Sequence, residues 1–348
     1  MSVLKPELVW VDGRCYRFLE QRDAATCNTP YVENDDLKYQ DCEEEFATDI
    51  EIVPYETAKF KHVFHVAKSF FPFIIGAKHQ VRKRLQNETK TTIQIPGPGQ
   101  DGDIKIIGYD HKGIITARHR INLIIESTRG RLNFTHFLSI PLNEDQIIMK
   151  FNTFKHDVMT FENTPRGVDE MLFQQPKKLH LTLGVLTLLD DIERDQAIKA
   201  LDYCKDHIIK AKIKKHGQIH IRLQGTDIMN DDPSEVNVLY ARIIDTNNIL
   251  QDIADEIVNH YANIGLLRKE KDRVKLHVTL MNTSFKLDDK EFTDKRKLRF
   301  DAREILKVHG NTIFGETTLK ELHISQRHTI SSNGYYQATA TINLAKDL

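Results

Sequence analysis

Cysteine, tryptophan and long apolar runs are all scarce in this chain of 348 residues. Its four cysteines are scattered and form no C-x-x-C pair, which argues against a disulfide framework or a zinc site. No run approaches the roughly 18 apolar residues of a membrane span, and the N-terminus has no apolar signal-peptide core. We therefore expect a nuclear or cytosolic protein with no membrane partner, and we expect no metal or other cofactor.

Net charge is also nearly absent, at −1, but the charges are segregated along the chain. Residues 1–56 hold 14 acidic and 5 basic residues, residues 57–130 hold 13 basic and 5 acidic, and residues 131–348 are balanced. A basic segment is expected of a protein region that contacts phosphate. The pattern predicts an acidic N-terminal segment, in which residues 3–18 are apolar enough to bind something and 19–56 form a disordered linker, then a basic module, then a larger domain.

A hexapeptide of the pattern K-L-H-x-T-L occurs twice, nearly a hundred residues apart. Each copy alternates apolar and polar residues, which is typical of a strand with one buried face. Side chains two apart on a strand point the same way, so His180 projects with Thr182, and His277 with Thr279. If the two copies lie side by side, two imidazoles and two hydroxyls surround one small site.

These residue types suit the cleavage of a phosphodiester without a metal. One imidazole can accept a proton from the attacking oxygen while the other protonates the leaving oxygen, so the pair should titrate as a coupled unit. The threonine hydroxyls can hold the non-bridging phosphoryl oxygens. We therefore predict His180, Thr182, His277 and Thr279 as catalytic residues. The pattern does not identify which histidine is the base.

A third H-x-S match, at His323, tests how specific this signal is. An isolated match is ordinarily a strand histidine with routine hydrogen bonds. His323 lacks the flanking lysine and a partner lobe, so we leave it out of the catalytic set; it either supports the site from behind or is structural. The matching flanks of the other two copies favour a functional role for them.

The duplicated motif resembles the signature of the 2H phosphoesterase superfamily over residues 133–348. The resemblance implies an α+β, bilobal and pseudo-duplicated domain in which His180 and His277 are the two catalytic histidines. The strand and helix patterns agree, with a helix expected to start at Asn143 and one long helix over 191–212.

Residues 57–130 follow the order βααββα and resemble a type I KH domain. That family clamps the backbone of a single-stranded nucleic acid with a G-x-x-G loop between two helices. The residues predicted to bind are Gly76, Ala77, Lys78, His79 and Arg82. His79 replaces the second glycine, so two interpretations stay open: binding of a single strand, with RNA favoured, or docking of another protein.

The order of the segments, and runs such as V-D-G-R-C-Y-R and P-K-K-L-H-L-T-L-G, resemble one family from end to end. Its members are subunits of a nuclear coactivator complex that contains a large helicase. The resemblance implies a helicase partner, docking around Trp10 to Tyr16, and roles in transcription coactivation and alkylation-damage repair. We expect a KH-tethered phosphoesterase acting on RNA or nucleotide ends. The alternative is a barely catalytic scaffold that holds a phosphate end in the same cleft.

Overall fold

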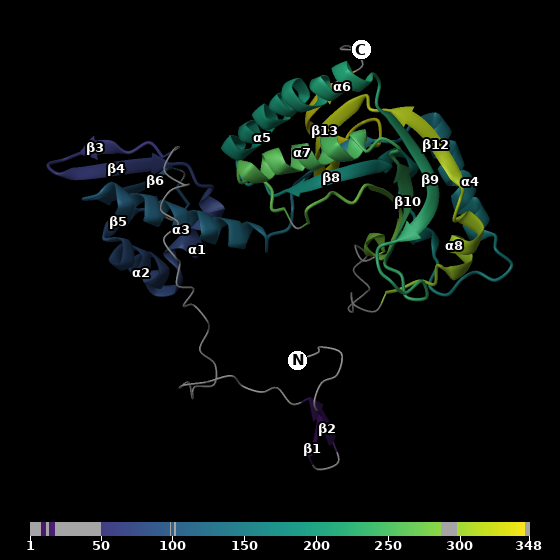
Figure 1. Ribbon diagram of the computed structural model, residues 1–348, viewed down its shortest axis with the longest axis horizontal. Helices are drawn as coiled ribbons and strands as arrows, with labels where there is room; N and C mark the ends of the chain where they lie inside the picture. Colours follow the sequence, from purple (N-terminus) through teal and green to yellow (C-terminus); the bar gives the residue numbers. More distant parts are fainter. Residues whose placement is uncertain are drawn as a thin grey trace. The chain divides into compact units, whose positions relative to one another are not determined.

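The computed structural model describes most of the chain after Ile50 and one hairpin before it (Figure 1). The described residues are 8–11, 14–17, 50–97, 99–100, 102–269, 271–286 and 298–344. The predicted linker up to residue 49 and most of a charged insertion at 286–299, predicted to be a loop, lie outside these ranges.

The chain forms two compact units, Met1–Ile50 and Glu51–Leu348. In the first unit, β1 (Leu8–Val11) and β2 (Arg14–Arg17) form an antiparallel hairpin. Trp10 lies opposite Cys15 in this hairpin, within the segment predicted to dock a partner.

The basic module is a four-stranded antiparallel sheet, of order β3-β4-β6-β5, with helices on one face (Figure 1). Its elements are β3 (Val53–Tyr55), β4 (Lys59–Phe64), α1 (Phe71–Ile75), α2 (Gln80–Thr89), β5 (Thr91–Gln94), β6 (Ile104–Gly108) and α3 (His111–Arg129). The predicted βααββα order is confirmed, and β3 adds an edge strand ahead of it. The prediction of a disordered linker over 19–56 was therefore wrong for Val53–Tyr55, which pair with β4. Ile74, Ile93, Ile106 and Ile114 fill the core between sheet and helices.

The sequence predicts a short helix or turn at 68–75, with a break near Pro72, but the helical segment continues through Pro72. Pro72 lies in the first turn of α1, after a 3₁₀ turn at Lys68–Phe70. The first turn of a helix has no intrahelical partner for its N–H groups, so proline is tolerated there.

The larger domain is built on an eight-stranded antiparallel sheet of order β12-β9-β10-β11-β8-β7-β13-β14. Its strands are β7 (His136–Pro141), β8 (His180–Leu186), β9 (His220–Ile228), β10 (Val238–Ile244), β11 (His277–Asn282), β12 (Ile313–Thr318), β13 (Glu321–Ile330) and β14 (Tyr336–Asn343). Its helices are α4 (Asp145–Met159), α5 (Asp191–Tyr203), α6 (Lys210–His216), α7 (Ile249–Asn263) and α8 (Arg303–His309).

This sheet has two lobes that meet at β8 and β11. The α4 and α8 helices pack against the lobe that contains β9 and β12, and α5 and α7 pack against the other lobe (Figure 1). The predicted bilobal, pseudo-duplicated α+β architecture is therefore confirmed. Buried aliphatic and aromatic side chains from both lobes join in one core beneath the sheet.

The structure of this domain differs from the sequence-based expectations in local detail. Glu144, not Asn143, is the N-cap of α4, and the Asn143 amide donates instead to the Lys177 carbonyl. The predicted long helix over 191–212 is confirmed, because α5, a π-helical turn at Cys204–Ile209 and α6 form one continuous helical run; the π-helical turn itself was not predicted. The β12 strand was not predicted. Among the described residues, no helix is both long and apolar enough to cross a membrane.

Candidate active site and nucleic-acid loop

The two K-L-H-x-T-L copies form neighbouring strands at the centre of the large sheet. Val278 of β11 lies opposite Leu181 of β8 in an antiparallel pair. This register places His277 opposite Thr182, and His180 opposite Thr279. Leu181 and Val278 are fully buried on the core side, so the histidines and threonines share the other face. The expected meeting of the two copies is confirmed, while the catalytic roles of their residues stay predictions.

Both imidazoles are oriented by the backbone two residues before them. His180 Nδ1 lies 2.7 Å from the Lys178 carbonyl oxygen, and His277 Nδ1 lies 2.6 Å from that of Lys275. A carbonyl can only accept, so each Nδ1 carries the proton and donates it. In each neutral ring Nε2 is then the basic nitrogen, free to take a proton.

His180 sits among aromatic rings. Its ring centroid lies 5.1 Å from that of Phe137 and 5.4 Å from that of Tyr336, which it meets edge to face. The Lys178 ammonium lies 5.3 Å from the centre of the Tyr336 ring, at cation–π distance. The Tyr336 ring thus contacts both the His180 imidazole and the Lys178 ammonium.

His277 has the same arrangement in the other lobe. Its ring meets Tyr240 edge to face at 5.4 Å, and the Lys275 ammonium lies 4.8 Å from the centre of that ring. The Tyr240 hydroxyl donates to Asp227 at 3.1 Å. The pseudo-duplication thus extends from the histidine and threonine to a lysine–tyrosine pair in each lobe.

The pKa values of both histidines are lowered. Burial lowers the pKa of His180 from 6.5 to about 4, and the neighbouring His277 contributes to this shift. Burial also lowers the pKa of His277, and the charge of Lys275 acts in the same direction. At neutral pH both rings are therefore neutral, whereas acid–base catalysis needs one to be charged. A bound phosphate anion favours the charged form of a nearby imidazole and can supply that state.

A buried polar cluster supports the His180 side of the site. Ser139 of β7 lies opposite Thr182 of β8. The Ser139 hydroxyl lies 2.9 Å from the Ser325 hydroxyl and accepts from the Tyr335 hydroxyl at 3.0 Å. His323 lies opposite Ser139 on β13, and its Nε2 is 2.9 Å from Glu321. The third H-x-S match therefore lies two strands from β8.

Sequence reasoning missed the lysines and tyrosines of the site. Lys178 and Lys275 precede the histidines in both copies of the hexapeptide, so the repeat itself carried a signal for them. Tyr240 and Tyr336 come from β10 and β14, and no local pattern marks them.

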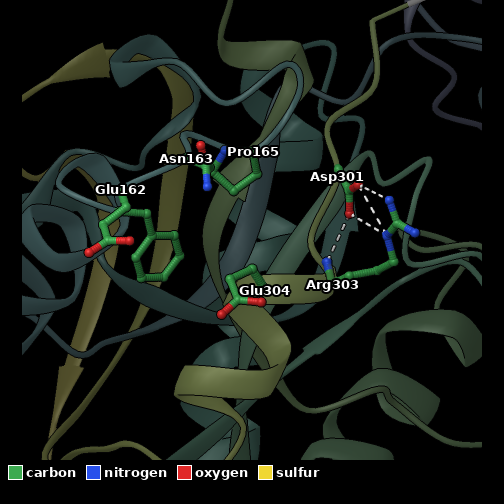
Figure 2. A pocket seen from close by; sticks show the side chains of 7 residues that line it. Glu162, Asn163, Pro165, Asp301, Arg303 and Glu304 are labelled. Atoms are coloured by element: carbon green, nitrogen blue, oxygen red, sulfur yellow. Dashed lines mark hydrogen bonds and ion pairs between the residues drawn. The ribbon is translucent and has the colours of Figure 1, made fainter.

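A cavity of about 720 Å³ lies elsewhere in the described residues. Figure 2 shows its lining, with the Arg303 guanidinium bonded to Asp301. The lining residues are Phe161, Glu162, Asn163, Pro165, Asp301, Arg303 and Glu304. The lining includes no residue of either hexapeptide, so we do not assign the chemistry to this cavity.

The predicted nucleic-acid loop connects α1 to α2 and keeps a glycine-like backbone. Gly76 has a φ of 71°, and a Cβ there would lie 2.3 Å from a methyl carbon of Val81. Lys78 and His79 also have positive φ, at 48° and 63°. His79 thus adopts the left-handed conformation that a second glycine would adopt without strain.

The side chains of this loop are available for contact. Ala77, Lys78 and His79 are exposed, and Arg82 follows on α2 with a buried Nε that has no partner within the described ranges. Clustered cations beside helix N–H groups match the demands of a phosphate backbone. Nucleic-acid binding by these residues stays a prediction.

Comparison with known proteins agrees with this two-part organisation. A family model described as an AKAP7 2'5' RNA ligase-like domain matches residues 134–344, and a KH-domain model matches residues 61–123. A solution structure of the first type I KH domain of human vigilin is 30% identical over 25% of this chain and 92% of that one, with a TM-score of 0.21.

Two relatives match much or all of the chain. An uncharacterized protein of Schizosaccharomyces pombe is 25% identical over 60% of this chain and 95% of its own length. The mouse protein activating signal cointegrator 1 complex subunit 1 is 36% identical over 99% of this chain and 100% of its own length. The chain therefore belongs to the family of activating signal cointegrator 1 complex subunit 1, with a KH domain followed by an AKAP7 2'5' RNA ligase-like domain of the 2H phosphoesterase type.

Proposed function

We propose that the larger domain is a metal-independent phosphodiesterase that acts on RNA or nucleotide ends. The observation that carries the proposal is the central strand pair. Its antiparallel register sets each histidine, with a basic Nε2 atom, opposite the threonine of the other strand. Paired imidazoles can transfer the two protons of a phosphodiester displacement. The family match to a 2'5' RNA ligase-like domain supports the same class of substrate.

In this mechanism one histidine takes the proton of the attacking oxygen through Nε2, and the other protonates the leaving oxygen. Thr182 and Thr279 donate to the non-bridging oxygens and stabilise the charge that builds up in the transition state. Lys178 and Lys275 provide the positive potential that attracts the phosphate. The bound anion in turn raises the pKa of a neighbouring imidazole and creates the acid.

The KH domain would deliver the substrate. Its loop at Gly76 to His79 would bind a single strand and raise the local concentration of phosphodiester near the catalytic domain. From the family we further propose a nuclear protein in a coactivator complex with a helicase subunit. Roles in transcription coactivation and alkylation-damage repair, and docking through the β1–β2 hairpin, belong to this proposal.

Cleavage of defined oligonucleotides in EDTA, read by mass analysis of the products, tests the catalytic proposal. The intact chain should cut, and His180→Ala and His277→Ala should each abolish cutting. His220→Ala is the matched control, because His220 is exposed at the start of β9. Unchanged product yields in either active-site variant would end the catalytic assignment.

The alternative is a scaffold that holds a phosphate end with little or no turnover. The lowered pKa values of both histidines favour it, because they leave no charged acid at neutral pH, and the lysines of the two lysine–tyrosine pairs can hold a phosphate without proton transfer. Two results together would support the scaffold over the enzyme. The intact chain would show only trace cleavage, and it would bind an oligonucleotide with micromolar affinity that Lys178→Met and Lys275→Met weaken.

Charge reversal at Lys78 and Arg82 tests the KH loop. Losing two phosphate contacts should weaken RNA binding and flatten its logarithmic salt dependence by about 1.4, since each single-strand contact contributes about 0.7. Reversal of Lys214 and Lys215, both exposed on α6, is the control with a similar charge change. Unaltered affinity of the loop variant would assign the KH domain to protein docking.

A further inference from the structure

The face of the KH sheet opposite its helices carries a group of lysines and tyrosines. We call it the outer sheet face and define it by Tyr55, Lys59, Lys61, Lys90, Lys105 and Tyr109. Strand alternation explains its composition: His62, Ile93 and Ile106 are buried toward the helices, so their neighbours along each strand point outward.

The register brings these outward residues together. Lys61 lies between Val53 of β3 and Ile107 of β6, and Thr92 of β5 completes that row. In the next row, Lys105 lies beside Gln94. Lys61 thus shares a row with the Thr92 hydroxyl across Ile107, and Lys105 lies directly beside the Gln94 amide on the same sheet surface.

Two of the lysines lie over tyrosine rings. The Lys61 ammonium is 4.9 Å from the ring centre of Tyr55, and the Lys59 ammonium is 5.8 Å from that of Tyr109. Tyr109 is 68% exposed, which is unusual for so large a ring. Cations interleaved with exposed aromatic rings are typical of surfaces that bind single-stranded nucleic acid.

A pocket of about 230 Å³ opens on this face. Tyr55, Lys59, Lys90, Gln94 and Tyr109 are among its lining residues. Glu56 also lines it and accepts from Lys59 at 2.9 Å, so the cations outnumber the acid there. The pocket thus combines rings that can stack with groups that can bind phosphate and polar edges.

We propose that the outer sheet face is a second binding surface for single-stranded RNA, separate from the KH loop. The lysines neutralise backbone phosphates, the tyrosine rings stack on bases, and the Thr92 hydroxyl and Gln94 amide hydrogen-bond base edges or 2′-hydroxyls. The loop lies on the side of the helices and this surface on the other side, so one KH domain can contact a strand twice.

Binding of a fluorescent oligouridylate to the full chain tests the proposal. Lys61→Glu with Lys105→Glu should weaken binding at least tenfold at moderate salt and flatten the salt dependence by about 1.4, as expected for two lost contacts. The control is Lys214→Glu with Lys215→Glu, which makes the same charge change and should bind within about twofold of the unaltered chain. The loop is tested by a different variant, with charge reversal at Lys78 and Arg82. A failure of RNA binding by the loop can therefore be told apart from a failure of binding by the outer sheet face.

Two further measurements keep the test decisive if the double variant folds poorly. Tyr109→Ala changes only an exposed ring and should weaken binding several-fold, and 4-thiouridine RNA should cross-link to the peptide that contains Tyr109. Cross-links confined to the loop peptide, or wild-type affinity in both variants, would overturn the proposal. Wild-type RNA affinity combined with carbodiimide cross-links from Lys61 to acidic residues before Ile50 would likewise overturn it and assign the surface to the acidic segment.

Discussion

Replacing His180 by glutamine should flatten the acid side of the stability curve. Burial lowers the pKa of His180 from 6.5 to about 4 in the folded chain, whereas the unfolded chain restores the ordinary value. Between these two values the unfolded state binds more protons, so the free energy of unfolding falls as the pH falls through this window. Glutamine does not titrate, and its variant should lack this contribution.

The expected size follows from the two pKa values. At about pH 5 the unfolded ring is mostly charged and the native ring is mostly neutral, so the linkage amounts to about 2 kcal/mol relative to about pH 7.5. His277 and the carboxylates titrate in both proteins, so their contributions largely cancel in the difference. The unaltered chain should therefore lose about 2 kcal/mol more than His180→Gln over this interval.

Urea unfolding at the two pH values measures this difference, with hydrogen exchange of the β8 and β11 peptides as the readout. Exchange in these strands reports the stability of the large sheet itself. His220→Gln, at an exposed position, should follow the unaltered chain. An identical pH dependence in His180→Gln and the unaltered chain would refute the argument that burial keeps this ring neutral.

Three other predictions concern charge and backbone. Lys275→Met should raise the pKa of His277 in an NMR titration, since the ammonium lowers it, and an unmoved pKa would contradict that cause. His79→Gly should raise the unfolding free energy of the KH domain by about 1 kcal/mol in thermal melts, because it relieves a left-handed residue; a loss of stability would show that the side chain compensates. Glu193→Ala should cost about 3 kcal/mol, since it leaves the buried Arg129 guanidinium without its carboxylate, and a cost under about 1 kcal/mol would count against a buried pair.

The central strand pair could be predicted because its signal is local and repeated. Two copies of one alternating hexapeptide specify which face each histidine occupies, and burial of Leu181 and Val278 follows from the same alternation. The partner strands of the site could not be predicted in this way. Tyr240 and Tyr336 approach the histidines through pairings of residues far apart in the chain, which no local pattern encodes.

The missed elements have local physical reasons. The β12 strand is a short edge strand interrupted by Gly315, so it shows little alternation. The π-helical turn at Cys204–Ile209 keeps the apolar spacing close to that of a helix, so the pattern read as one helix. The sequence shows that His79 replaces the second glycine of the loop. It does not show whether a histidine adopts the positive φ of a glycine there, as the structure does.

The most direct test of the account is single-turnover cleavage by His180→Asn, His277→Asn and the double variant. Each single change removes one acid–base group and should lower the rate on the order of 10²–10⁴-fold. The effects of substituting two residues that act as a unit on one phosphorus are strongly non-additive. The double variant should then lose little more than either single variant. Losses that multiply, or a double variant that cleaves at a rate close to that of the unaltered chain, would contradict a shared two-histidine site.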